Sequence, residues 1–342
     1  MKQALVNILT NKGMTSYLIL IDGHFLSNFN LQSSKILIMK QMFFVVLSFL
    51  CLQVSAQEFS NAWKDVNYAN DTISYHNMDI YLPKIKKDKY PVVVYIYGSA
   101  WLSNRSKGDD LGTIGAALLD AGFAVVMPNH RASYNALFPA QVHDIKAVVR
   151  FLRANADDYS IDTNFIGVSG SSSGGNLAAM MGVTGGVTDF SIDDANANLE
   201  GNVGAYAGYS SSVDAVVAWF PPTNMLIMNS CGGTDMNHDD VKSPASLYIG
   251  GAIQENKAKT LLASPTSYVS SSNPPFLIFH GNKDRVVPHC QSEILYEALK
   301  KADVDVEFVL VEGGGHGPGV HVKENIDKMV EFFNDKFKSL NK

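Results

Sequence analysis

The chain has 342 residues, of which 46% are hydrophobic and 18% charged, and its formal net charge is −6. This composition is typical of a globular protein that can bury a large core. The acidic balance makes nucleic acid an unfavourable partner.

The amino-terminal region has the pattern of an export signal. Residues 39–41 carry a lysine, residues 42–52 are mostly apolar, and the small residues Val54-Ser55-Ala56 come directly before Gln57. An apolar run of this length is too short to span a bilayer comfortably. We therefore predict a signal at 39–56, cleavage after Ala56, a secreted or periplasmic mature protein and no stable membrane insertion after cleavage. An uncleaved membrane anchor is the alternative.

Residues 1–38 form an upstream extension with no predicted fold, and the sequence leaves open whether the true start is Met39. Removal of residues 1–56 takes away four lysines and one aspartate, which changes the formal charge from −6 to −9. The mature chain is therefore more strongly acidic than the whole one.

Residues 57–342 are predicted to form a single α/β domain. Apolar runs typical of buried strands alternate along it with runs typical of helices. This alternation predicts a doubly wound, mostly parallel sheet with helices on both faces and an antiparallel start. The expected strands are 78–82, 91–97, 123–127, 164–169, 213–219, 275–280 and 305–311, and the expected helices are 109–121, 139–155, 174–181, 290–302 and 321–339.

The most informative motif follows the strand expected at 164–169. Gly170, Ser172 and Gly174 give a Gly-x-Ser-x-Gly spacing, and the residues after it favour a helix. A nucleophile at such a turn needs small neighbours, because its backbone is strained and the helix starts directly against the strand. Ser172 is therefore the candidate nucleophile.

A serine hydroxyl also needs a histidine to accept its proton and a carboxylate to orient that histidine. Asp284 comes after the strand expected at 275–280, and His316 lies in a glycine-rich loop after the strand expected at 305–311. Residues just past the carboxyl ends of parallel strands lie on the functional edge of a sheet. The chain order Ser172, Asp284, His316 is the order found in α/β-hydrolases.

These motifs resemble those of α/β-hydrolase esterases, and most closely the acetylxylan and feruloyl esterase-like branch related to the hormone-sensitive lipase group. The loop Tyr97-Gly98-Ser99-Ala100-Trp101 is similar to the His-Gly-Gly-Ala-Trp loop of that family and departs from it at Tyr97 and Ser99. The resemblance covers nearly all of residues 65–340. Its other matching stretches are 129–131, 138–144, 149–155, 170–177, 219–223, 280–288 and 312–317.

The resemblance implies the α/β-hydrolase fold and a secreted serine carboxylesterase that removes acetyl or feruloyl groups from plant polysaccharide. It also implies an oxyanion hole made by the backbone N–H group of Ser99 or Ala100 together with that of Ser173, which follows the nucleophile. If Ser99 must adopt a positive φ, its side chain costs about 1 kcal/mol. No cofactor is expected, and small-molecule or polysaccharide esters are the expected substrates.

A stretch rich in Gly, Ser, Asn and Asp, at about 182–212, is expected to be an inserted loop that overhangs the site. The expected substrate-binding aromatic residues are Trp101, Tyr206, Tyr209 and Trp219, although aromatic residues near strands are more often part of the core.

The acidic stretch 235–240 is expected to be a solvated turn and not a metal site. Cys231 and Cys290 are the cysteines of the mature chain, and the sequence leaves open whether they pair.

Two other functions fit the same order of Ser, Asp and His. A serine peptidase of the prolyl oligopeptidase type would normally carry a large amino-terminal propeller domain, for which residues 57–342 leave no room. A catalytically inactive binding protein on the same fold would be expected to lack one of the three residues, and all three are present. The acyl group, the alcohol and the oligomeric state are left open.

Overall fold

The computed structural model describes residues 59–340. Their main feature is an eight-stranded sheet in which β1 and β2 run antiparallel to their neighbours and the other neighbouring strands pair in parallel. The predicted antiparallel start is thus confirmed. In spatial order the strands are β1 (Asn61–Asn67), β2 (Asn77–Leu82), β4 (Ala124–Pro128), β3 (Tyr90–Ile96), β5 (Ile161–Ser171), β8 (Ala215–Trp219), β9 (Phe276–Gly281) and β10 (Val306–Val311).

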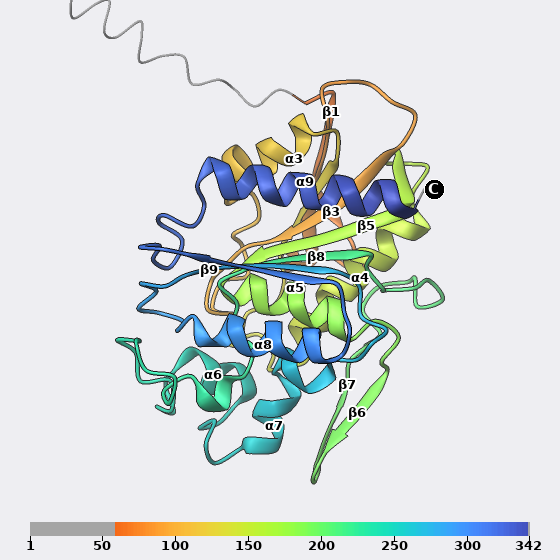
Figure 1. Ribbon diagram of the computed structural model, residues 1–342. Helices are drawn as coiled ribbons and strands as arrows, with labels where there is room; N and C mark the ends of the chain where they lie inside the picture. The colour runs from red at the N-terminus through yellow and green to blue at the C-terminus, as the bar shows by residue number, and fades with distance from the viewer. Residues whose placement is uncertain (1–58, 341–342) are drawn as a thin grey trace, which may run out of the picture. The chain divides into compact units, whose positions relative to one another are not determined.

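The central strands are apolar on both faces because helices cover both sides of the sheet. Every residue of β3, β4 and β8 is buried, as expected for strands inside a parallel sheet. One face carries α4 (Ala140–Ala154), α5 (Ser173–Val183) and α8 (Cys290–Lys301), and the other carries α3 (Ala116–Asp120) and α9 (Lys323–Leu340) (Figure 1). A π-helical turn, η2 (Leu111–Gly115), leads into α3.

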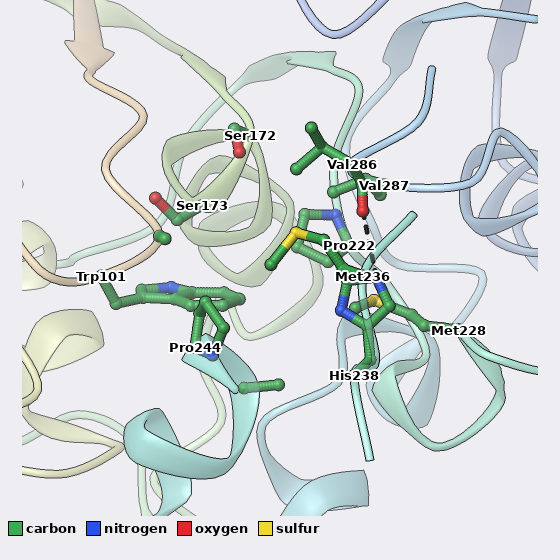
Figure 2. A pocket seen from close by; sticks show the side chains of 12 residues that line it. Trp101, Ser172, Ser173, Pro222, Met228, Met236, His238, Pro244, Val286 and Val287 are labelled. Atoms are coloured by element: carbon green, nitrogen blue, oxygen red, sulfur yellow. Dashed lines mark hydrogen bonds between the residues drawn. The ribbon is translucent and has the colours of Figure 1, made fainter. Parts of the chain in front are cut away.

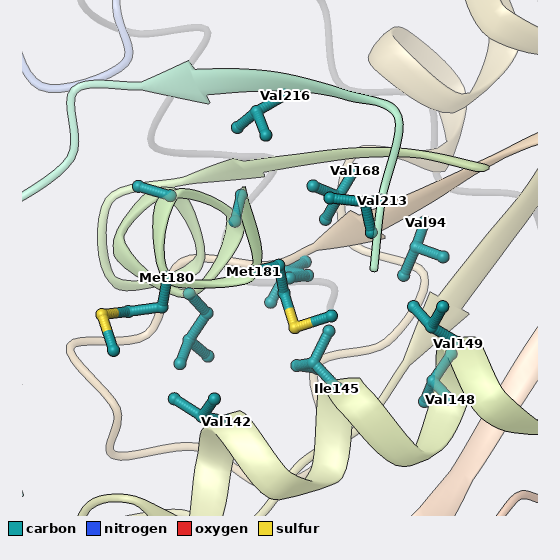
Figure 3. Close-up of a cluster of buried hydrophobic side chains, with 14 of the residues drawn as sticks. Val94, Val142, Ile145, Val148, Val149, Val168, Met180, Met181, Val213 and Val216 are labelled. Carbon is teal, nitrogen blue, oxygen red and sulfur yellow. The ribbon is translucent and has the colours of Figure 1, made fainter. Parts of the chain in front are cut away.

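Each face of the sheet has its own apolar core. Figure 3 shows the first, where Val94, Val168 and Val216 from the strands lie among side chains of the two nearest helices. Ile145 of α4 and Met181 of α5 are among these helical side chains. The second core joins the opposite side of the same strands to α3 and α9. The predicted doubly wound architecture is therefore confirmed.

All seven predicted strands and all five predicted helices are present. Their ends are shifted by at most three residues when η2 and α3 together are compared with the helix predicted at 109–121. The structure adds elements that we did not predict. They are β1, a separate hairpin of β6 (Asp189–Ile192) and β7 (Ala195–Asn198), the helices α6 (Pro244–Ile249) and α7 (Lys257–Leu262), and the 3-10 turns η1 (Ser74–His76), η3 (Met225–Ile227) and η4 (Pro265–Tyr268).

The predicted overhang of the segment at about 182–212 is wrong. This segment lies along α4, where Glu200 binds two buried cations. The Lys146 ammonium donates to the Glu200 carboxylate at 3.0 Å and to the Thr184 carbonyl at 2.8 Å, and the Arg150 guanidinium pairs with the same carboxylate. Because an unpaired buried cation is very unfavourable, these contacts hold the segment on the side of the helix.

Between residues 59 and 340, none of the helices combines the length and apolar character required to cross a bilayer. The predicted signal at 39–56 and its cleavage site lie outside the described residues and stay predictions.

Candidate active site

Ser172 occupies the sharp turn between β5 and α5. Its backbone has φ 56° and ψ −120°, a conformation that costs about 1–3 kcal/mol for a residue with a side chain. Two glycines make the turn possible. A Cβ added to Gly170 would lie 2.3 Å from the Gly174 carbonyl oxygen, and one added to Gly174 would lie 2.1 Å from the Ile96 carbonyl oxygen. The chain can therefore present the Ser172 hydroxyl only with glycine at both positions.

A hydrogen-bonded chain of three side chains begins at this hydroxyl. The Ser172 Oγ lies 2.9 Å from Nε2 of His316, and Nδ1 of His316 lies 2.7 Å from Oδ2 of Asp284. Asp284 follows β9 and His316 follows β10, so the parallel sheet brings both loops to the edge where β5 ends. The three residues singled out in the sequence thus lie together, in the order required for proton transfer from the serine.

The Asp284 carboxylate is buried and accepts several hydrogen bonds. Its Oδ1 accepts from the backbone N–H groups of Val286 and Val287 at 2.8 and 2.9 Å, and its Oδ2 also lies 3.3 Å from Nε2 of His280. Burial by itself raises the pKa of Asp284, but the hydrogen bonds with His280 and His316 outweigh it and hold the pKa well below the usual value. Asp284 is therefore an anion that fixes the orientation of the His316 ring.

The glycines before His316 let its loop approach the loop of Asp284. A Cβ added to Gly281 would lie 2.1 Å from the Gly314 carbonyl oxygen. The Lys283 N–H donates to that same carbonyl at 2.8 Å. Close backbone contact, and not flexibility, therefore explains the glycine-rich sequence beside the histidine.

The loop after β3 passes directly over the serine turn. A Cβ added to Gly98 would lie 2.7 Å from the Ser171 carbonyl oxygen. The Ser99 N–H donates to the Ser173 hydroxyl at 2.8 Å, so this N–H is already engaged. Within residues 59–340, the backbone N–H groups of Ala100 and Ser173 make no hydrogen bond. Of the three predicted oxyanion donors, Ala100 and Ser173 are free to serve, whereas Ser99 is not.

The strain that we expected at Ser99 falls on its neighbours. Ala100 and Trp101 have φ values of 53° and 57°, while Ser99 avoids the left-handed region. At Tyr97, where the related esterases carry histidine, the hydroxyl donates to the Ser103 carbonyl at 3.0 Å and the ring stacks on His130 at 4.7 Å. Local contacts thus accommodate Tyr97, whereas the Ser99 hydroxyl oxygen is buried and has no hydrogen-bond partner among the described residues.

A small cavity of about 50 Å³ opens beside Ser172 (Figure 2). Trp101 forms one wall of it below Ser172 and Ser173 in this view, and Met228, Met236 and His238 lie opposite. The walls are mainly apolar, so the cavity suits a small uncharged group. Its lining consists of Ala100, Trp101, Ser172, Ser173, Pro222, Met228, Met236, His238, Pro244, Ala245, Val286 and Val287.

Three of the four predicted substrate-binding aromatic residues do not line this cavity. The Tyr206 hydroxyl donates to the Asn155 side chain at 3.3 Å, at the carboxyl end of α4, and Tyr209 packs against Tyr206. Trp219 is fully buried below the serine turn, where its carbonyl accepts the Ser172 N–H at 2.9 Å. These assignments were wrong because the segment at about 182–212 lies along α4, and because the end of β8 is covered on both faces.

Residues 224–249 form a wall of the cavity beside Ser172 that we did not predict from the sequence. His238 is buried, and its Nε2 bonds to the Val286 carbonyl at 3.0 Å, so this part of the acidic stretch is not a solvated turn. A disulfide between Cys231 and Cys290 joins the segment to the first residue of α8. We call residues 224–249 the covering segment.

A second polar chain lies on the other side of the serine turn. The Ser171 hydroxyl is 2.8 Å from the Tyr95 hydroxyl and 3.2 Å from Nε2 of His321, and the Tyr95 hydroxyl donates to Asp110 at 2.6 Å. Burial lowers the pKa of His321, which favours the neutral ring. This chain joins β3, β5 and the loop of His316, and no sequence motif indicated it.

No cluster of three or more His, Cys, Asp or Glu side chains that could hold a metal ion occurs within the described part of the chain. In the acidic stretch, Asp235 pairs with Arg285, and Asp239 accepts a hydrogen bond from Gln254 at 2.9 Å. The carboxylates of this stretch are therefore directed to other partners.

Comparison with known proteins gives consistent matches. The BD-FAE family model matches residues 78–299. Esterase LipQ of Mycobacterium tuberculosis is 29% identical over 62% of this chain and 46% of its own length. Esterase LipC of the same organism is 27% identical, over 66% of this chain and 53% of its own length. The chain thus spans about half the length of these curated relatives.

Two solved structures are closer in sequence. A truncated form of a carbohydrate esterase from gut microbiota is 42% identical, with a TM-score of 0.80, and covers 83% of this chain and 99% of that one. The bifunctional GH43-CE protein of Bacteroides eggerthii is 44% identical, with a TM-score of 0.78, over 81% of this chain and 35% of that one. The propionate-bound esterase Est2 of Thermogutta terrifontis, at 21% identity and a TM-score of 0.59, shares the fold.

Proposed function

Because the chain belongs to the BD-FAE family and has the α/β-hydrolase fold of esterases, we propose that it is a serine carboxylic ester hydrolase that removes short acyl groups, acetyl above all, from carbohydrate. The observation that carries the proposal is the bonded chain from Ser172 through His316 to Asp284, which faces a small cavity with two unengaged N–H groups.

The proposed reaction starts at the Ser172 hydroxyl. His316 Nε2 accepts its proton as Oγ attacks the ester carbonyl carbon. The negative charge that develops on the carbonyl oxygen is stabilised by the N–H groups of Ala100 and Ser173. The Asp284 carboxylate stabilises the protonated His316, and its low pKa keeps it ionised throughout.

The intermediate collapses when His316 returns the proton to the alcohol oxygen, which breaks the ester bond and leaves the acyl group on Ser172. Water then attacks this acyl group, with His316 again accepting a proton. The free acid leaves, and the Ser172 hydroxyl is restored.

The size of the cavity supports a short acyl group. Its volume is about 50 Å³, whereas one ordered water needs roughly 10–15 Å³ on the same scale. It therefore has room for only a few non-hydrogen atoms, which suits an acetyl group. A feruloyl group has an aromatic ring and a three-carbon linker, so of the two acyl groups considered from the sequence the cavity favours acetyl.

Two further observations support a carbohydrate substrate outside the cell. The most similar solved structures quoted above are a carbohydrate esterase and a GH43-CE protein. The Cys231–Cys290 disulfide fits an oxidising compartment, in agreement with the export signal predicted at 39–56. We therefore propose that the mature protein acts after secretion.

The test uses purified mature protein and acetyl, decanoyl and peptide amide substrates, together with acetylated xylan and feruloylated arabinoxylan fragments. We expect kcat/KM for the acetyl ester to exceed that for the decanoyl ester by at least about tenfold, or about 1.4 kcal/mol. Acetylated xylan should release acetate. The proposal would be overturned if the decanoyl and acetyl esters had equal kcat/KM values and acetylated xylan released no acetate. Faster cleavage of the peptide amide than of the esters would favour a peptidase.

A matched pair of variants locates the reaction. Ser172→Ala should lower kcat by several orders of magnitude without a change in thermal unfolding, because the hydroxyl takes part in the chemistry and not in the core. Ser191→Ala, in the distant β6–β7 hairpin, is the control and should behave like the wild type. Normal activity in Ser172→Ala would remove Ser172 as the nucleophile.

A further inference from the structure

A second, larger hollow is lined in part by residues that neighbour those of the acyl cavity along the chain. Its volume is about 390 Å³, compared with about 50 Å³ for the cavity beside Ser172, and it lies within the roughly 300–1,000 Å³ of ordinary ligand sites. We call it the outer groove. Small residues such as Ser133 and Gly251 form part of its lining. The large apolar side chains that line it are Leu102, Tyr134, Leu137, Val241 and Leu247.

These five side chains are unusually exposed for their type. Tyr134 is 67% exposed, Val241 57%, Leu137 48%, and Leu102 and Leu247 41% each. They come from three separate segments of the chain, yet they converge on one hollow. Isolated exposed apolar residues need no explanation, but a convergent group of them marks a binding surface.

The groove and the acyl cavity are lined by neighbouring residues of the same stretches of chain. Trp101 lines the cavity and Leu102 lines the groove, and likewise Ala245 lines the cavity and Ser246 the groove. The Trp101 carbonyl accepts hydrogen bonds from both the N–H and the hydroxyl of Ser133, at 2.8 and 3.1 Å. The groove is therefore held at a fixed place relative to Ser172. An ester whose acyl group fills the cavity must place its alcohol part outside the cavity, and the residues next in the chain to the cavity wall line this groove.

The chemistry of the groove selects among possible occupants. None of its lining residues is charged, so it suits a neutral ligand. Two amides lie close in the chain to the lining residues Leu102 and Tyr134, and Asn104 donates to Asn135 at 2.8 Å. A sugar ring packs its C–H face on an aromatic or aliphatic surface while its hydroxyls bond to amides. A lipid chain has no groups that could form hydrogen bonds with these amides.

We propose that the outer groove binds the sugar rings of the substrate on the alcohol side of the ester, with Tyr134 as the packing platform. This inference rests on the proposed esterase function. It assigns the small cavity to the acyl group and the larger groove to the carbohydrate.

The test compares two acetyl esters that differ only in the alcohol, an acetylated xylo-oligosaccharide and 4-nitrophenyl acetate. Tyr134→Ala and Leu247→Ser should each lower kcat/KM for the oligosaccharide by about tenfold, mainly through KM, and change that for 4-nitrophenyl acetate less than twofold. Tyr209→Ala is the control, since Tyr209 is a half-exposed tyrosine whose ring packs against Tyr206, away from the groove. An equal loss on both esters, or no loss on the oligosaccharide, would overturn the proposal.

A binding measurement separates this proposal from the proposed function. Deacetylated xylo-oligosaccharide should bind the Ser172→Ala variant in calorimetry, and about tenfold more weakly when Tyr134→Ala is added. Binding without any ester hydrolysis by the wild type would support the groove and refute the esterase function. Ester hydrolysis without sugar binding would refute the proposed role of the groove but not the esterase function. The same conclusion would follow if Tyr134→Ala lowered kcat/KM for dodecyl acetate and not for the sugar ester.

Discussion

The Asp284 carboxylate accepts bonds from two backbone N–H groups and lies against two histidines, His280 and His316. His280 in turn is fixed by the Ser292 hydroxyl at 2.7 Å and the Val287 carbonyl at 2.9 Å. Hydrogen-bond partners thus surround the Asp284 carboxylate and fix its position. Its contacts stabilise the folded state as well as the orientation of His316.

Asp284→Asn should therefore destabilise the protein more at neutral pH than in acid. Burial raises the pKa of Asp284 but its hydrogen bonds lower it further, so the pKa lies below the unfolded value of about 3.9. Such a group contributes stability above the unfolded pKa and loses it as the pH falls toward the folded pKa. In urea unfolding, the difference between the wild type and Asp284→Asn should shrink from pH 7 to pH 3.

Asp194→Asn, on the exposed β6–β7 turn, is the control for this experiment and should change stability little at either pH. A difference for Asp284→Asn that is the same at pH 7 and pH 3 would contradict the stabilising role of the ionised carboxylate.

The Ser173 side chain supports the loop after β3, because its hydroxyl accepts the Ser99 N–H. Ser173→Ala keeps the backbone N–H but leaves the Ser99 N–H without its acceptor, a loss of about 1–3 kcal/mol where the group is buried. We expect kcat for an acetyl ester to fall about tenfold with little change in KM. A normal kcat in this variant would show that the loop holds its shape by itself.

The sequence allowed us to predict that Ser172, Asp284 and His316 lie together, but not the contacts that support them. Ser172, Asp284 and His316 each follow an apolar strand and stand in a diagnostic order. The Ser99 N–H is engaged by the Ser173 hydroxyl, and Ala100 and Trp101 have positive φ values. No pattern of residue types specifies either feature.

Among the elements, β3, β5 and the loop of His316 are joined by the polar chain of Tyr95, Ser171 and His321. His321 also donates its backbone N–H to the Gly317 carbonyl, one residue from the catalytic histidine. The chain therefore links the turn of the nucleophile to the loop of the base. It belongs to no known motif because its members are scattered over the sequence.

His321→Ala should lower kcat about tenfold while KM stays nearly constant, because it frees the His316 loop relative to Ser172. His321→Gln, which retains a polar group, should recover part of the loss. Steady-state kinetics with an acetyl ester measure both. Identical values for the two variants would indicate that the ring only fills space.

The disulfide sets the stability of the covering segment. Cys231 and Cys290 are 59 residues apart, and closing a loop of this length stabilises a protein by about 4 kcal/mol in the chain-entropy model. The double variant Cys231→Ser/Cys290→Ser should unfold at lower urea by a corresponding amount, yet still cleave an acetyl ester. If reductant leaves the unfolding of the wild type unchanged, the bond does not contribute in solution.

Whether a helix or strand could be predicted from the sequence depended on its length. The long helices α4, α8 and α9 and the apolar parallel strands gave clear patterns. The helix α6 carries helix-end signals, with Ser243 capping its start, Pro244 in its first turn and Gly250 at φ 81° after its end. Its six residues are too few to show a period, so the covering segment went unrecognised.

For the whole molecule, the export signal predicts that the mature protein begins at Gln57. Expression with the full amino terminus in a bacterial host that exports proteins, followed by intact mass and amino-terminal sequencing, measures this start. We expect a chain of residues 57–342 outside the cytoplasm. Retention of residues 39–56 on a membrane-associated protein would instead establish an uncleaved anchor.

The reactive groups and the walls around them have different origins in this molecule. Ser172, Asp284 and His316 follow the carboxyl ends of β5, β9 and β10, so the sheet fixes their positions. The covering segment supplies Met228, Met236 and His238 from a stretch that forms no strand of the sheet. Substitutions in it can widen or narrow the acyl cavity while the reaction stays intact, which gives natural selection a way to change the preferred ester without inventing new chemistry.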